Sequence, residues 1–92
     1  MTPEEFWNLM NSQPFTPVLN RGLPGDNVTA VFKVGGFDGE VGYRYVDGRP
    51  VTFVRVHLPS GTIEAFFTLQ EHTLYWTKEP TREQTILLRL NL

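Results

Sequence analysis

The side chains best suited to acid–base chemistry lie between Arg55 and Glu64. Arg55 and His57 alternate along one extended segment, and Glu64 follows a Pro-Ser-Gly turn in the next segment. A carboxylate that holds an imidazole is a common arrangement of a general base. A cross-strand polar pair on an exposed sheet uses the same residues, and we favour that simpler interpretation. We therefore predict no catalytic residue.

The register across the turn decides which of these side chains meet. A tight turn at residues 59–61 sets His57 opposite Glu64, and Arg55 then faces Phe66. A shift of two residues sets Arg55 opposite Glu64 instead. Both registers place the four side chains in one patch, and only a bulge in the turn would separate them.

Alternation along the extended segments sorts the side chains onto two faces of a sheet. We use the name face B for the face that mixes aromatic and aliphatic residues with arginine, because a plain solvated face would carry Lys, Glu, Thr and Ser. Arginine and aromatic residues are enriched in binding surfaces. The candidate binding residues of face B are Arg44, Phe53, Arg55, His57, Glu64, Phe66, Tyr75 and Arg89.

The charges suggest what face B could bind. Most acidic residues fall in the expected first helix or in turns, and Glu64 is the acid in mid-strand, so a chain of net charge −2 is expected to carry a locally basic face. We predict a protein partner or a second copy of the chain, anchored by Phe53, Phe66 and Tyr75. The plainer alternative is that arginine stems cover apolar surface and leave their charged ends in water.

Several other kinds of site find no support in the sequence. The chain has no cysteine, which excludes disulfides, thiolate chemistry and cysteine-based metal sites. Glycines are dense between Gly35 and Gly42, but no Lys-Ser or Lys-Thr pair follows them, as a phosphate-binding loop requires. We expect no metal site and no cofactor.

The first element is a predicted helix over about residues 2–13. Thr2 can cap it, Pro3 takes the first helical position, and Glu5 completes a capping-box pattern, after which apolar residues recur at helical spacing. Prolines then end the helix. An irregular arm over residues 14–27 follows.

Residues 28–92 alternate with period two between turn signals, which predicts strands joined by short connections and therefore antiparallel. The apolar face of these strands, face A, forms the core, with Val56, Phe67 and Leu88 buried. The fold class is α+β, a single domain over residues 1–92: an N-terminal helix packed on a curved antiparallel β-meander of five or six strands that could close into a barrel. The predicted strands lie near 28–34, 40–46, 51–58, 62–69, 72–78 and 85–92.

The leading hypothesis is a small non-enzymatic binding protein. One alternative is a small β-barrel that binds, or acts on, an anionic small ligand through Arg55, His57 and Glu64. Another is single-stranded nucleic-acid binding, which the net charge of −2 makes the weakest candidate. No apolar run approaches the ~20 residues of a membrane span, and the acidic N-terminus does not resemble a signal peptide, so we expect no membrane association and a cytoplasmic protein.

Overall fold

The computed structural model describes residues 1–19 and 25–92, and its first element is the helix α1 (Pro3–Asn11). Thr2 caps this helix, because its Oγ1 accepts a hydrogen bond of 3.1 Å from the Glu5 amide. That bond satisfies one of the amides that a helix start leaves without a partner. The N-terminal helix predicted from the sequence is confirmed.

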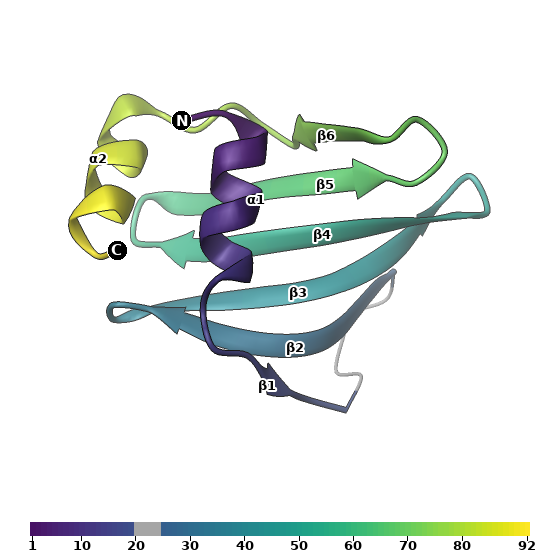
Figure 1. The fold of residues 1–92 in the computed structure, drawn as a ribbon, viewed down its shortest axis with the longest axis horizontal. Helices are drawn as coiled ribbons and strands as arrows, with labels where there is room; N and C mark the ends of the chain where they lie inside the picture. Colours follow the sequence, from purple (N-terminus) through teal and green to yellow (C-terminus); the bar gives the residue numbers. More distant parts are fainter. Residues whose placement is uncertain (20–24) are drawn as a thin grey trace.

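A six-stranded antiparallel sheet follows, in which each strand pairs with the next one along the chain (Figure 1). The curved meander is thus confirmed; because β1 and β6 lie at opposite edges, the sheet stays open and does not form the barrel that the number of strands would have allowed. A short strand interrupts the predicted arm over 14–27, whose residues 20–24 lie outside the described part. The strands are β1 (Thr16–Pro17), β2 (Asp26–Val34), β3 (Phe37–Val46), β4 (Arg49–Leu58), β5 (Gly61–Thr68) and β6 (Thr73–Trp76).

The C-terminal segment is a second helix, α2 (Arg82–Leu90), and the strand predicted over 85–92 is wrong. Thr81 Oγ1 accepts from the Gln84 amide (3.1 Å), while the Gln84 side chain accepts from the Thr81 amide (2.9 Å). These two bonds form a complete capping box. Neither described helix is long and apolar enough to cross a membrane.

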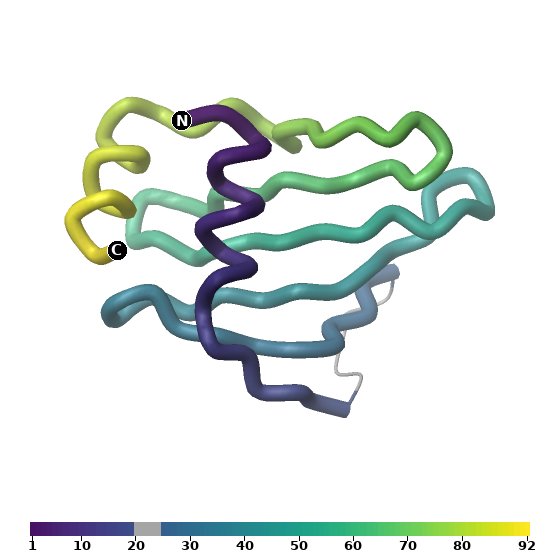
Figure 2. Tube along the Cα trace, in the orientation of Figure 1, coloured from purple at the N-terminus to yellow at the C-terminus, as the bar shows by residue number. Residues whose placement is uncertain are grey.

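The core lies between face A of the sheet and the two helices. Figure 2 shows α1 running across the strands rather than along them. From α1, Phe6 is fully buried, and its ring centroid lies 5.3 Å from that of Trp76 on β6. The predicted core residues Val56 and Leu88 are fully buried, whereas Phe67 is only partly buried.

The turn between β4 and β5 pairs Leu58 with Gly61, which sets Arg55 opposite Glu64. This is the second of the two registers considered from the sequence. His57 consequently faces Thr62 rather than Glu64.

Strand β2 bends toward face B. Its register with β3 shifts between Val28 and Ala30, and such a bulge bends a strand. A Cβ at Gly42 would lie 2.1 Å from the Asn27 carbonyl oxygen and 2.9 Å from the Phe53 ring, so the close approach of β2 requires a glycine there. Val28 and Phe53 are consequently buried on face B, although both helices contribute to the core on face A.

Candidate functional site

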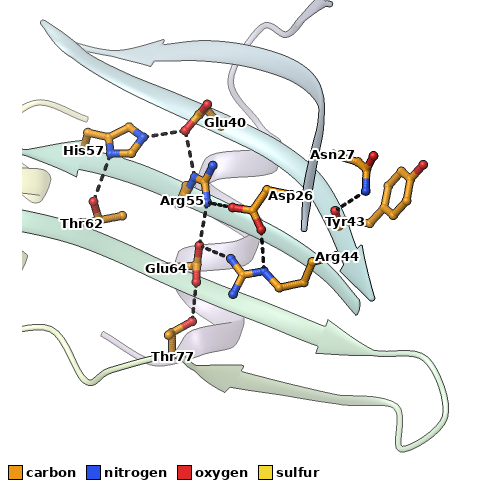
Figure 3. A network of polar contacts seen from close by, with 10 residues as sticks. All are labelled: Asp26, Asn27, Glu40, Tyr43, Arg44, Arg55, His57, Thr62, Glu64 and Thr77. Atoms are coloured by element: carbon orange, nitrogen blue, oxygen red, sulfur yellow. Dashed lines mark hydrogen bonds and ion pairs between the residues drawn. The ribbon is translucent and has the colours of Figure 1, made fainter. Parts of the chain in front are cut away.

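Arg55 lies at the centre of a charged network on face B that connects β2, β3, β4 and β5 (Figure 3). Its Nε donates a hydrogen bond to Glu40 Oε1 (2.8 Å), and its Nη1 donates to Asp26 Oδ2 (2.9 Å) and to Glu64 Oε2 (3.3 Å). Burial by itself lowers the pKa of Arg55, but the hydrogen bonds to Asp26 and Glu40 raise it above its ordinary value. Arg55 is therefore a fixed cation that holds three strands to its own.

Arg44 completes the network from β3. Its Nη2 donates to Glu64 Oε2 (2.9 Å), and its Nε lies 3.1 Å from Asp26 Oδ1. The second carboxylate oxygen of Glu64 accepts from the Thr77 hydroxyl (2.7 Å). Glu64 is nearly buried, with 10% of its side chain exposed, and a buried charge is tolerated only when it is paired and hydrogen-bonded in this way.

The two arginines cover Phe53. The Arg44 Cζ lies 5.0 Å and the Arg55 Cζ 4.5 Å from the centroid of its ring, which is fully buried. A cation placed over an aromatic ring is attracted to the ring face, and each such interaction contributes ~0.5–2 kcal/mol. Phe53 therefore cannot be touched by a partner in this conformation, contrary to its predicted role as an apolar anchor. The alternative in which arginine side chains cover apolar surface is thus met in part. The guanidinium groups cover Phe53, but they are paired with carboxylates and do not extend freely into water.

His57 extends the network to the exposed part of face B. Its Nε2 lies 2.6 Å from Glu40 Oε1, and its Nδ1 lies 3.0 Å from Thr62 Oγ1. Burial raises the pKa of Glu40, but hydrogen bonds from His57 and Arg55 outweigh this effect and lower the pKa below its ordinary value. Glu40 therefore stays a carboxylate at neutral pH.

Within the charged network of residues 26–64, the expected excess of positive charge is not observed. The network contains the carboxylates of Asp26, Glu40 and Glu64 against the guanidinium groups of Arg44 and Arg55. Sequence reasoning missed Asp26 and Glu40 because each lies close to a turn signal, where acids are usually solvated. The alternation of side chains along the strand was the available signal. Glu40 and Arg44 are separated by an even number of positions, so both point to the same face.

The other predicted site residues divide between two places. Phe66 on β5 and Tyr75 on β6 lie side by side on face B, with ring centroids 5.6 Å apart, and both are partly buried. Arg89 is not on face B, because its segment is helical. It forms an ion pair of 2.9 Å with Glu5 of α1, and both side chains are about half exposed.

Two depressions meet at His57 on face B. The larger is an open groove of about 720 Å³ beside β1, and the smaller has about 240 Å³ and joins Arg55, His57 and Glu64 with Thr62, Thr77 and Lys78. The smaller depression thus brings together the three residues that the sequence suggested for an anionic ligand. The larger groove is lined by residues that the sequence did not single out, apart from His57; they include Pro14, Thr16, Val31, Lys33 and Glu40.

Comparison with known proteins finds no match for the chain. No family model matches it, and no curated protein or solved structure is significantly similar to it. The function is therefore inferred from the geometry of face B.

Proposed function

We propose that the chain is a protein-binding module whose groove on face B receives a segment of a partner polypeptide. The observation that carries this proposal is the groove itself, of about 720 Å³, on the sheet face opposite the helix-covered core. Its volume lies within the range of ligand-binding sites. It opens beside β1, a strand of two residues whose Thr16 forms part of its lining.

The lining of the groove suits a polypeptide. Val31 and Pro14 offer apolar contacts, whereas Glu40 and the ion pair between Lys33 and Asp38 offer charges of both signs. Mixed polar and apolar contacts are typical of surfaces that bind proteins. A polyanion would instead need a surface on which positive charges predominate.

The second candidate is an anionic small ligand, and the 240 Å³ depression with Arg55, His57 and Glu64 is the observation in its favour. Against it, Arg55 already donates hydrogen bonds to three carboxylates of its own chain. The same neutralisation counts against nucleic acid, because phosphate binding depends on cations that release counterions from the phosphates.

Photo-crosslinking tests the proposal. A benzoylphenylalanine at Val31 places the reactive group in the groove, and the same residue at Thr52 is the matched control, because Thr52 is exposed on face A of β4. After capture from nuclease-treated lysate of the source cells, we expect a crosslinked peptide from one partner at position 31 and none from that partner at position 52.

The groove can also be blocked. Val31→Arg should abolish the crosslinked complex formed by the wild type, whereas Thr52→Arg should leave it unchanged. A crosslink to a second copy of the chain would identify self-association as the form that the binding takes. Equal crosslinking at both positions, or no crosslink at position 31, would show that the groove is not a protein-binding site.

A further inference from the structure

We infer that Thr62 is an activated hydroxyl that accepts an acyl group from an ester or thioester, with His57 as its base and Glu40 holding the imidazole. The three side chains lie in a row on adjacent strands, Glu40 on β3, His57 on β4 and Thr62 on β5 (Figure 3). This inference concerns the depression beside the groove, and it stands whether or not the groove binds a partner.

The hydrogen-bond network determines where the imidazole proton lies. Glu40 Oε1 also accepts from Arg55 Nε (2.8 Å), and an ionised carboxylate can only accept. His57 Nε2, at 2.6 Å from the same oxygen, must therefore donate to it. In the neutral imidazole, Nδ1 then carries the lone pair, at 3.0 Å from Thr62 Oγ1. This tautomer is assigned from the bonding partners.

The resulting chain of hydroxyl, imidazole and carboxylate has the logic of an activated nucleophile. The two ring nitrogens exchange the positions that they have in the serine-protease triad. Either nitrogen can take up a proton, so the exchange does not alter the acid–base chemistry. The three groups sit on paired strands, and Arg55 Nε binds the carboxylate of Glu40, so strand pairing and this ion pair set their relative positions.

The surroundings provide charge and space for an acyl donor. Thr62 and His57 line the 240 Å³ depression together with Lys78, which forms no ion pair with any residue of ranges 1–19 and 25–92. A cation there can stabilise the negative charge that develops on the carbonyl oxygen of the donor. The adjoining groove shares His57 and has apolar walls at Val31 and Pro14, where an apolar leaving group or acyl chain fits.

The step balances without a further reactant. Thr62 Oγ1 forms a bond to the acyl carbon, and the bond from that carbon to the sulfur or oxygen of the leaving group breaks. The hydroxyl proton passes to His57 Nδ1 and then to the departing thiolate or alkoxide. The products are acyl-threonine and a free thiol or alcohol.

The test uses p-nitrophenyl acetate as the acyl donor on the whole chain, read by peptide mass spectrometry. We expect acetylation of the peptide that carries Thr62, retained in Thr62→Ser and absent in Thr62→Val, which has the same shape without the hydroxyl. His57→Gln and Glu40→Gln should slow the reaction, by about 10²-fold for loss of the base. Ser60→Ala is the matched control, because Ser60 carries an exposed hydroxyl in the preceding turn. The Ser60→Ala variant should be acetylated on Thr62 at the same rate as the wild type.

Acetylation of lysine side chains gives a background that none of these variants should change. Circular dichroism of each variant verifies that the sheet is retained. A plain cross-strand hydrogen bond predicts a different outcome: no acetyl group on Thr62, or acetylation of Thr62 that proceeds equally fast in His57→Gln. Either result would overturn the inference.

Discussion

Replacing Arg55 with methionine tests whether the charged network holds the sheet together. Methionine keeps a long unbranched stem but removes the guanidinium, so three carboxylates lose a donor at once. Removing one partner of a buried ion pair costs about 3–5 kcal/mol, because the remaining charge is left unpaired. We expect the lower end, about 3 kcal/mol, because the side chain retains 14% exposure and Arg44 still contacts two of the carboxylates. That is a large share of the 5–15 kcal/mol typical of a domain.

Urea unfolding at neutral pH, followed by the fluorescence of Trp7 and Trp76, measures this free energy. Arg89→Met is the matched control, since Arg89 has one carboxylate partner and is about half exposed. Exposed pairs contribute ~0.2–1 kcal/mol, so the control should lose little stability. If Arg55→Met were no more destabilising than Arg89→Met, the network would contribute no more to stability than an exposed ion pair does. The conclusion that Arg55 holds four strands together would then be wrong.

Three further predictions concern the elements that support the site. Gly42→Ala should destabilise the fold by at least ~1–3 kcal/mol in urea unfolding, because its Cβ would lie 2.1 Å from a backbone oxygen of β2. Gly36→Ala is the control and should change the free energy of unfolding little, because no atom lies within 4 Å of the added Cβ. The lowered pKa of Glu40 contributes stability that is present above its unfolded-state pKa of about 4.3 and is lost as the pH falls through the lower folded-state value. Glu40→Gln should therefore lose less stability than the wild type on acidification, and equal slopes in a pH series of melts would contradict this. Thr81→Ala should cost ~0.5–2 kcal/mol, with a loss of helical circular dichroism, if the cap holds α2.

The parts of the fold that the sequence predicted are those whose signals are local. Thr2 and Pro3 indicate the start of α1, and period-two alternation with short turns indicates an antiparallel meander. The pairing of Arg55 with Glu64 was one of two registers that alternation allowed, and the turn geometry that chose between them is not visible in residue types.

The predictions that failed concern segments where a strand pattern competes with a helix pattern, or where distant residues meet. The leucines from Leu88 to Leu92 alternate as in a strand, but a helix places residues two apart on different sides, so Leu88 is buried while Leu90 is exposed. The capping box from Thr81 to Gln84 was the signal that would have revealed α2. The contribution of Asp26 to the site could not be predicted, because it requires β2 to bend over face B.

The most direct test of the groove as a binding surface is an amide chemical-shift titration with the partner segment that crosslinking identifies. We expect the shifts to cluster on β2 and β3 around Val31 and Glu40, and Val31→Arg to abolish them. A cluster elsewhere, such as on the exposed side of α2 around Ile86 and Leu90, would place the binding surface outside face B and show that the groove is not the binding site.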